Sequence, residues 1–321
     1  MFAVYAAEPN PADPLAALRI GDRPEPAVSE GEVAVQVVAA SLNLHDLWTL
    51  RGVGITPEQF PMILGCDGAG VLPDGSEVMI YPVITSPGWT GDETLDPRRT
   101  LLTERLQGSF ADTVVVPERN VVPKPSALTF AEAACIGTSW LTAYRMLFVK
   151  SGLRPGQTML VQGASGGVST ALVQLGRVAG MRVWVTGRTE DKRALACSLG
   201  AHQAFESGAR LPERVDAVFE TVGKATWSHS ARCLKPGGII VCSGATSGDT
   251  ERAELQRLFF LQLRMVGSTM GTRDELLDLL SLLDITGVCP HIGAELPMSE
   301  PAQGFKAILD GDTAGKIVFV R

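Results

Sequence analysis

The 321-residue sequence lacks the features that mark several classes of protein. No apolar run approaches the roughly 18 residues of a membrane-spanning helix. The first residues, MFAVYAAEPNPADP, do not combine a basic start with an apolar stretch as a signal peptide does. No dense run of Lys and Arg is present, and a net charge of −7 disfavours a surface for phosphate backbones. We therefore expect a cytoplasmic protein that binds neither a membrane nor nucleic acid.

Paired cysteines are also missing. The six cysteines form no CxxC pair and have no histidine at the spacing of a metal finger, so we expect reduced thiols. What is present is the composition of an ordinary globular α/β protein, with 45% hydrophobic and 20% charged residues. Because domains usually hold roughly 100 to 200 residues, the length predicts two of them.

The distribution of strand and helix patterns divides the chain. Residues 1–124 contain short alternating strands, such as 32–40 and 111–116, broken by Gly and Pro. A helical texture begins near residue 128, where Thr129 and Glu132 form a capping-box pattern. From residue 157 strands alternate with helices, which predicts a parallel, doubly wound sheet. We expect a doubly wound domain over 125–286 and a β-rich domain over 1–124 and 287–321, completed by the last strand.

A glycine-rich loop lies between the first strand and the first helix of the doubly wound part. It reads Gly-Ala-Ser-Gly-Gly-Val-Ser over residues 163–169. A pyrophosphate needs backbone N–H groups at a helix N-terminus and residues without a Cβ atom, which Gly166 and Gly167 supply. Ala164 and Ser169 replace the first and third glycines of the GxGxxG pattern. The sequence predicts a dinucleotide site contacted by Ala164, Ser165, Gly166, Gly167 and Val168, with a ligand-free turn as the alternative.

The residues after the second strand of this part indicate which dinucleotide is bound. An NAD site places an Asp or Glu there for the ribose 2′-hydroxyl, whereas this chain has Thr186 and Arg188. Arg188, with Lys192 one helical step further on, suits a 2′-phosphate, so the sequence predicts NADPH. Two alternatives remain open: Arg188 lies in a solvent-exposed loop without a ligand, or Glu190 binds the ribose.

Five blocks of sequence occur in order along the chain. They are Ser-Leu-Asn-Leu-His-Asp-Leu-Trp at 41–48, Leu-Gly-Cys-Asp-Gly-Ala-Gly-Val at 64–71, Leu-Thr-Ala-Tyr at 141–144, Gly-Ser-Thr-Met-Gly at 267–271 and Gly-Lys-Ile-Val at 315–318. With these blocks the chain resembles the medium-chain dehydrogenase/reductase superfamily over essentially its whole length, and its quinone oxidoreductase-like branch most. The resemblance implies a GroES-like first domain, a Rossmann second domain, an active site in the cleft between them, and a homodimer.

The chain departs from the zinc-dependent members of that superfamily. Their catalytic metal is held by a Cys, by a His that a Glu follows, and by a second Cys. By resemblance these places hold Asn43, Cys66 followed by Asp67, and Thr138. A catalytic zinc needs three protein ligands, and the four-cysteine lobe for structural zinc is also missing, since 87–107 contains no cysteine. We therefore predict no metal; the alternative is an unusual site made of Cys66, Asp67 and His45.

The expected lack of a catalytic metal limits which reaction the chain can catalyse. Without a Lewis acid to stabilise an alkoxide, we expect reduction of an acceptor with its own electron sink, a quinone or an α,β-unsaturated carbonyl. The resemblance implies that Asn43 orients cofactor or substrate, that His45 is a proton donor and that Asp46 holds the local loop or partners His45. Structural roles for His45 and Asp46 remain alternatives, and Cys66 is interpreted as a buried thiol rather than a nucleophile.

The resemblance also implies further cofactor contacts, among which a solvent-facing role for Lys316 stays open. Two other functions also stay open. One is an alcohol or aldehyde dehydrogenase of the same superfamily, and the other is a non-catalytic NADPH-binding sensor. The implied contacts are Thr142, Thr186, Val222 with Gly223, Ser243, Gly244 and Lys316.

Overall fold

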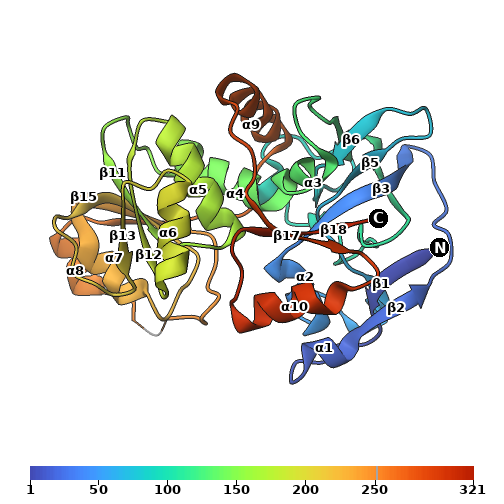
Figure 1. Ribbon diagram of the computed structural model, residues 1–321, viewed down its shortest axis with the longest axis horizontal. Coiled ribbons are helices and arrows are strands. Elements are labelled where there is room, and N and C mark those ends of the chain that lie inside the picture. Colours follow the sequence, from blue (N-terminus) through green and yellow to red (C-terminus); the bar gives the residue numbers. More distant parts are fainter. Residues whose placement is uncertain (251) are drawn as a thin grey trace. The chain divides into compact units, whose positions relative to one another are not determined.

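The computed structural model describes residues 1–250 and 252–321 and contains two compact units (Figure 1). Unit 1 comprises Met1–Ser139, Gly271–Ile285 and Cys289–Arg321, and unit 2 comprises Trp140–Met270 and Thr286–Val288. This division differs from the expected domain boundaries, because 125–139 and 271–285 pack with unit 1.

Contacts within unit 1 explain the difference. Helix α3 (Phe130–Ala133) packs against strands of the unit 1 sheet and so stays with the β-rich part of the chain. Tyr81 Oη donates to the Gly271 carbonyl at 2.8 Å, and Arg273 Nε donates to the Arg119 carbonyl at 3.0 Å. A change from a strand pattern to a helix pattern along the sequence therefore does not mark the boundary between the two packed units.

Strand β3 (Glu32–Leu42) is the long central strand of the main sheet in unit 1. It pairs antiparallel with β5 (Ala69–Val71), β9 (Thr113–Pro117) and β18 (Lys316–Val320). Both predicted strands of the first module are thus present, and the last strand returns to this module as expected. The remaining strands of unit 1 are β1 (Phe2–Ala6), β2 (Leu18–Asp22), β4 (Met62–Ile63), β6 (Glu77–Ile80), β7 (Val83–Ile84), β8 (Thr100–Leu101), β10 (Val121–Pro123) and β17 (Ile292–Pro297).

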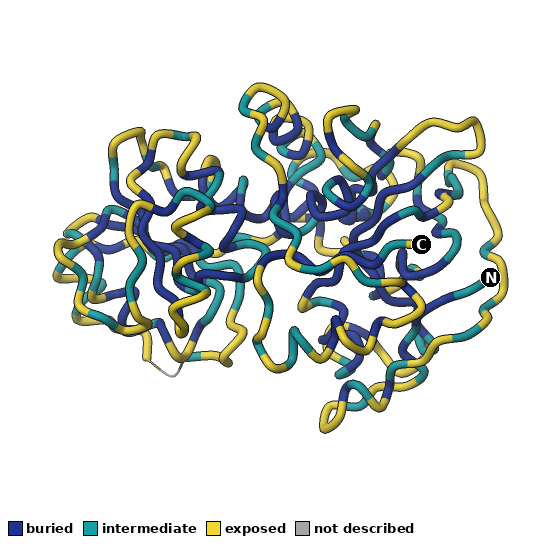
Figure 2. The backbone as a smooth tube through the Cα atoms, viewed as in Figure 1, coloured by how far each residue is buried: buried dark blue, intermediate teal, exposed yellow. Residues whose placement is uncertain are grey.

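Apolar side chains from these strands form the core of unit 1. In Figure 2 the buried stretches follow the central strands. The Phe110 ring meets the Phe319 ring edge to face with centroids 5.0 Å apart, a preferred aromatic geometry. The short helices of this unit are α1 (Pro14–Ala17), α2 (Leu44–Leu50) and α3, and the longer ones are α9 (Arg273–Thr286) and α10 (Pro301–Asp310).

Unit 2 contains a six-stranded sheet whose neighbouring strands are all parallel, in the order β13-β12-β11-β14-β15-β16. In chain order this is 3-2-1-4-5-6, the strand order of the Rossmann fold. The predicted combination of a GroES-like β-rich part and a doubly wound sheet is therefore confirmed. The strands are β11 (Thr158–Gln162), β12 (Arg182–Gly187), β13 (Gln203–Glu206), β14 (Val215–Glu220), β15 (Leu234–Cys242) and β16 (Arg264–Gly267).

Helices cover both faces of this sheet because successive side chains of each strand alternate between the faces. Helix α5 (Gly167–Val178) packs closely on one face: a Cβ atom at Gly176 would lie 2.6 Å from Met159 Sδ. Helix α6 (Glu190–Ser198) follows β12. On the other face, α7 (Trp227–Cys233) and α8 (Leu255–Phe260) contribute to a separate core cluster with Leu160 and Val218.

The segment from 129 to 148, expected to be helical, alternates between two helix types. Thr129 caps α3 and forms the predicted capping box, with its N–H donating to Glu132 Oε2 at 2.8 Å. A π-helix (Ile136–Trp140), α4 (Leu141–Tyr144) and a second π-helix (Arg145–Lys150) follow. Such wide turns are rare and concentrate at functional sites.

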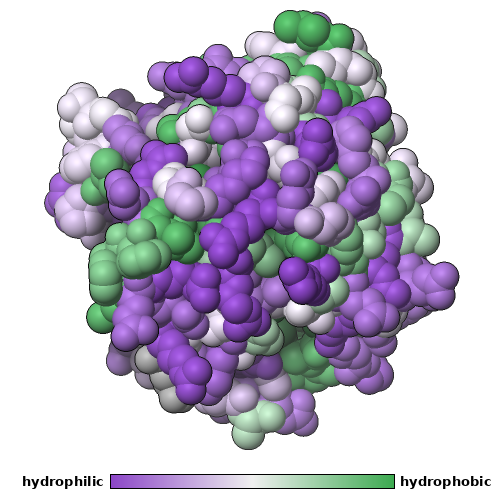
Figure 3. Space-filling view, turned by 90° about the vertical axis from the view of Figure 1, so that its left-hand side faces the viewer, coloured by the Kyte–Doolittle hydropathy of each residue, from purple (hydrophilic) through white to green (hydrophobic). Residues whose placement is uncertain are grey.

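The described part of the chain, residues 1–250 and 252–321, has no helix that is both long and apolar enough to span a bilayer. Figure 3 looks onto the side of the molecule at the left of Figure 1 and shows apolar areas among hydrophilic ones. Helix α8 exposes Leu255, Phe259 and Phe260 by 65%, 70% and 80%. Assembly into a homodimer stays a prediction.

Candidate active site

The end of β3 and the start of α2 place Asn43 and Asp46. Asp46 Oδ2 accepts from the Asn43 backbone N–H and Oδ1 accepts from the Gly65 N–H, both at 2.8 Å. Burial raises the pKa of Asp46 to about 6, against the opposing influence of His45 and the two backbone hydrogen bonds. Asp46 thus joins two loops, the role that the resemblance implies for it.

Lys316 lies beside Asn43 because β18 runs antiparallel to β3, with Ile317 opposite Leu42. Its ammonium is buried and donates to Asn43 Oδ1 at 2.6 Å, to the Leu42 carbonyl at 3.0 Å and to Ser139 Oγ at 3.2 Å. These acceptors take all three N–H groups of the ammonium. The structure therefore places Lys316 inside unit 1 and not in a solvent-facing position, and its contact with a cofactor stays a prediction.

Asp67 is the acceptor at the centre of the same cluster. Its Oδ2 accepts from Asn43 Nδ2 at 2.8 Å and from Ser41 Oγ at 3.0 Å, and its Oδ1 accepts from Thr138 Oγ1 at 2.7 Å. Lys316 Nζ lies 3.9 Å from Oδ2. Burial raises the pKa of Asp67, and the Lys316 ammonium is the strongest influence in the other direction.

Backbone geometry lets these groups approach. A Cβ atom at Gly137 would lie 2.9 Å from Asp67 Oδ1, so the glycine brings the π-helix against the carboxylate. Gly315, just before Lys316, has φ +104, and a Cβ atom there would lie 2.6 Å from the His291 carbonyl. Only glycine suits such a left-handed, crowded position.

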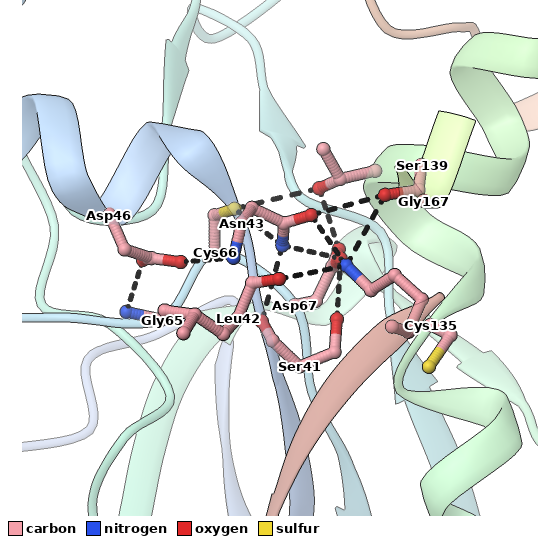
Figure 4. Close-up of polar contacts among 12 residues, drawn as sticks. Ser41, Leu42, Asn43, Asp46, Gly65, Cys66, Asp67, Cys135, Ser139 and Gly167 are labelled. Carbon is pink, nitrogen blue, oxygen red and sulfur yellow. Dashed lines mark hydrogen bonds and ion pairs between the residues drawn. The ribbon is translucent and has the colours of Figure 1, made fainter. Parts of the chain in front are cut away.

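The Asn43 side chain is saturated within the cluster. Its Nδ2 donates to Asp67 and, at 3.2 Å, to the Ser41 carbonyl, while Oδ1 accepts from Lys316 and, at 3.2 Å, from Ser139. Figure 4 shows Asn43, Cys66 and Asp67 converging. Because an amide has two donors and two acceptor positions, this arrangement leaves no free donor for a substrate. A direct contact of Asn43 with substrate or cofactor stays a prediction that this geometry does not favour.

The four positions at which zinc-dependent members hold or support their metal do come together, yet they form a hydrogen-bonded network. Cys66 is buried, and burial, followed by Asp46 and Asp67, raises the pKa of its thiol well above the usual range. Its Sγ lies 3.5 Å from Thr138 Oγ1. Asn43 and Thr138 offer neither a thiolate nor an imidazole, and a cysteine binds zinc only as a thiolate. Among residues 1–250 and 252–321, no group of three His, Cys, Asp or Glu side chains is arranged to hold a metal ion. These residues do not fit a catalytic zinc.

His45 faces a different partner. Its Nε2 is buried without a hydrogen bond and lies 3.9 Å from Glu104 Oε1. Glu104 Oε2 accepts from Thr100 Oγ1 at 3.0 Å and from the Leu101 N–H at 2.9 Å, so its carboxylate is fixed. Nothing in the local sequence pattern indicates Glu104, because only the fold brings it to α2.

In unit 2 the predicted glycine loop connects β11 to α5, beside the point where the chain order of the strands reverses. Gly163 has φ +85, and Gly166 is the N-cap of α5. A Cβ atom at Gly163 would lie 3.5 Å from Val222 Cγ2, so the loop after β14 is its neighbour. The first N–H groups of α5 lack partners within the helix, and this geometry suits a pyrophosphate.

Arg188 is exposed directly after β12, and Lys192 lies in the first turn of α6. Sequence analysis missed Arg193, whose Nη1 donates to the Gly187 carbonyl at 3.0 Å. Thr186 is different, since its buried hydroxyl donates to Gln162 Oε1 at 2.5 Å and is thereby engaged inside the unit.

The remaining predicted cofactor residues lie at several places in unit 2. Thr142 is buried in α4, and Ser243 and Gly244 follow β15 at the same carboxyl edge as the glycine loop. Ser243 Oγ is buried without a hydrogen-bond partner. Contact of these residues with a cofactor stays a prediction.

Comparison with known proteins gives the family. Residues 29–126 match the alcohol dehydrogenase GroES-like domain, and residues 167–284 match the zinc-binding dehydrogenase model. The chain is 29% identical over 310 residues to crotonyl-CoA carboxylase/reductase from Cereibacter sphaeroides, covering 80% of the chain and 72% of that protein. It is 25% identical over 313 residues to quinone oxidoreductase from Mus musculus, covering 92% of the chain and 91% of the relative.

A solved structure agrees over the full length. The crystal structure of an NAD-dependent alcohol dehydrogenase has a TM-score of 0.92 and 32% identity, with 100% of both chains covered. One relative of this identity, aligned throughout, shows common ancestry together with the two family matches. The chain belongs to the medium-chain dehydrogenase/reductase superfamily.

Proposed function

We propose that this chain is an NADPH-dependent reductase that transfers hydride to a quinone or an α,β-unsaturated carbonyl without a catalytic zinc. One observation carries the proposal: the side chains in the zinc positions bond to each other and to the Lys316 ammonium. The names of the relatives, a quinone oxidoreductase and a crotonyl-CoA carboxylase/reductase, agree with a conjugated acceptor.

Acceptors of this kind suit the chemistry of the site. Bound NADPH would supply the hydride, and the negative charge then develops on an oxygen conjugated to the reacting carbon. The protein has to orient the acceptor and provide a proton or hydrogen bond to that oxygen. A Lewis acid is not required, in contrast to the oxidation of a simple alcohol.

His45 is the candidate for the proton. Its buried Nε2 has no hydrogen-bond partner, in contrast to the saturated amide of Asn43. The fixed Glu104 carboxylate 3.9 Å away would balance the charge of an imidazolium. Of Asn43, His45 and Asp46, to which the resemblance assigns roles in the site, His45 alone combines a buried nitrogen without a partner with a suitable neighbour.

The choice of NADPH rests on the residues after β12. Arg188, Lys192 and Arg193 supply positive charge there, and β12 ends without a carboxylate. The solved alcohol dehydrogenase is named NAD-dependent. The expected preference for NADPH therefore rests on the residues of this chain and not on that relative.

The test is consumption of NADPH and of NADH by the purified protein, offered one quinone, one enone and one simple ketone, with and without a metal chelator. We expect turnover of the quinone or the enone with NADPH, unchanged by the chelator. Arg188→Ser should weaken the binding of NADPH at least tenfold and leave the binding of NADH unchanged, because one bidentate phosphate contact is worth about 1.5–3 kcal/mol. The matched control is Arg182→Ser at the other end of β12.

Other outcomes would contradict the proposal. Turnover of the ketone alone, lost with the chelator, would instead support an alcohol dehydrogenase, the function named for the solved relative. Tight NADPH binding without turnover of any acceptor would support a sensor. If Arg188→Ser weakened the binding of NADPH and of NADH equally, Arg188 would not be the residue that contacts the 2′-phosphate.

A further inference from the structure

The three loops of the proposed cofactor site leave the sheet next to three buried polar residues. Gln162 ends β11 just before the glycine loop, Thr186 lies two residues before Arg188, and Glu220 ends β14. The side chains of all three are fully buried. Buried polar groups at strand ends have to be paired. Here Thr186 pairs with Gln162, and Ser230 links Gln162 to Glu220.

Gln162 is the centre of this pairing. Its Oε1 accepts from Thr186 Oγ1 at 2.5 Å, and its Nε2 donates to Ser230 Oγ at 3.0 Å. The same Nε2 lies 2.9 Å from His229 Nδ1, and the other ring nitrogen of His229 lies 2.8 Å from the Ala209 carbonyl. These contacts fit the tautomer that accepts at Nδ1 and donates at Nε2.

Glu220 continues the network to the loop after β14. Its Oε2 accepts from Ser230 Oγ at 2.6 Å, and its Oε1 accepts from the backbone N–H groups of Val222 at 2.8 Å and Gly223 at 3.1 Å. Thr226 Oγ1 donates to the same carboxylate at 2.9 Å. A continuous series of hydrogen bonds therefore connects the end of β12 with the loop after β14.

The position of the network relative to the sheet is informative. Gln162 pairs with Thr186 in register, two residues after Leu160 pairs with Trp184. By the two-residue period of strands, Gln162 and Thr186 share the face on which Leu160 packs with α7 and α8. The glycine loop leads into α5 on the opposite face. The network thus supports the loops from the side that α5 does not cover.

We propose that the network of Thr186, Gln162, Ser230 and Glu220 is a positioning device that holds the three cofactor loops in their binding geometry. None of the four is assigned a contact with the cofactor; each acts through the loop or the residue that it holds. The inference rests on the proposed NADPH function. It changes the role of Thr186, which sequence analysis expected to contact the cofactor.

The first test compares three variants. Thr186→Val removes the hydroxyl at nearly constant volume, Thr186→Ser keeps it, and Thr158→Val makes the same change at an equally buried threonine at the other end of the sheet. Leaving Gln162 Oε1 without its donor should raise the NADPH dissociation constant about tenfold in Thr186→Val. Arg188 lies two residues further on and is the proposed contact of the 2′-phosphate, which NADH lacks. The binding of NADH should therefore weaken less. Thr186→Ser should restore most of the affinity.

The second test needs no cofactor. Ser230→Ala separates Gln162 from Glu220, and we expect faster hydrogen exchange at the Val222 and Gly223 amides than in Thr158→Val. Unchanged exchange, or NADPH affinity in Thr186→Val equal to that of Thr158→Val, would overturn the inference. A wild-type protein that binds neither nucleotide would refute the proposed function instead, and the exchange measurement would still decide whether the network holds the loop.

Discussion

Asp67 in unit 1 and Glu220 in unit 2 are both fully buried carboxylates, but they are satisfied in different ways. Asp67 lies 3.9 Å from the Lys316 ammonium, and that ammonium also fixes its neighbour Asn43. Both carboxylates accept from neutral donors, which for Asp67 are Asn43, Ser41 and Thr138 and for Glu220 are backbone N–H groups and the hydroxyls of Thr226 and Ser230. The difference is the cation beside Asp67. Hydroxyls can turn to donate or accept, whereas an ammonium can only donate. The unit 1 cluster should therefore tolerate less change than the unit 2 cluster.

The largest effect should come from removing the ammonium. Lys316→Met leaves the Asp67 carboxylate buried without a cation and Asn43 Oδ1 without its shorter hydrogen bond. Breaking a buried pair in this way costs about 3–5 kcal/mol, so the free energy of unfolding of unit 1 should fall by that order. Urea denaturation followed by a probe in unit 1 measures it.

The pH dependence of this loss has a definite sign. The pKa of Asp67 is already raised, and removing Lys316 takes away the strongest influence that lowers it. The folded variant then binds a proton that the unfolded chain releases, so its stability decreases as the pH rises. The free energy of unfolding that Lys316→Met loses relative to the wild type should therefore be smaller at pH 5 than at pH 8. An equal deficit at both, or one no larger than in the control Lys306→Met at an exposed lysine, would contradict the importance of the ion pair.

The sequence was sufficient to predict the parts of the fold that depend on local pattern. The capping box of Thr129 and Glu132, the alternation in β3 and β9 and the glycine loop before α5 depend on neighbours in the chain. The division into units depends on which side chains α3 and α9 contact, and no local pattern records this. Prediction from residues and resemblance therefore located the elements better than the boundaries.

The same limit applies to the site. Sequence analysis selected Asn43, His45, Asp46 and Lys316, and the structure places all four in unit 1 near the ends of β3 and β18. It could not indicate that Lys316 saturates Asn43, because that depends on the antiparallel register of the two strands. Glu104, Arg193 and the Gln162 network were missed for a related reason: each owes its position to a contact between separate elements.

Asp46 is a third buried carboxylate, and it accepts hydrogen bonds from two backbone N–H groups. Burial raises its pKa from 3.8 to about 6. Between these values the folded state binds more protons than the unfolded state, so this group contributes stability below pH 4 that is lost as the pH rises through 6. The shift corresponds to about 3 kcal/mol at most. Unfolding measured from pH 4 to 7 should show this decline, and Asp46→Asn should flatten it; an unchanged slope in the variant would assign the decline to another group.

A matched pair of conservative substitutions tests the comparison directly, with the smallest effect expected in unit 2. In Glu220→Gln the amide oxygen can keep the bonds from Val222 and Gly223 while the NH2 group faces Ser230, whose hydroxyl can turn to accept. We expect a loss of about 1 kcal/mol. In Asp67→Asn the new NH2 group can face only Thr138, whose hydroxyl can turn to accept, because the Asn43 Nδ2 donor is fixed at the other position.

The Lys316 ammonium explains why the second member of the pair should cost more. Asn43 Nδ2 cannot reverse while Lys316 holds its Oδ1, and the ammonium is left buried without a counter-charge. We expect about 3 kcal/mol for Asp67→Asn, and unfolding monitored separately in each unit compares the two variants. Equal losses would mean that the Lys316 ammonium adds nothing to the hydrogen bonds that both carboxylates receive from neutral donors. The distinction between a carboxylate beside a cation and one held by neutral donors would then fail.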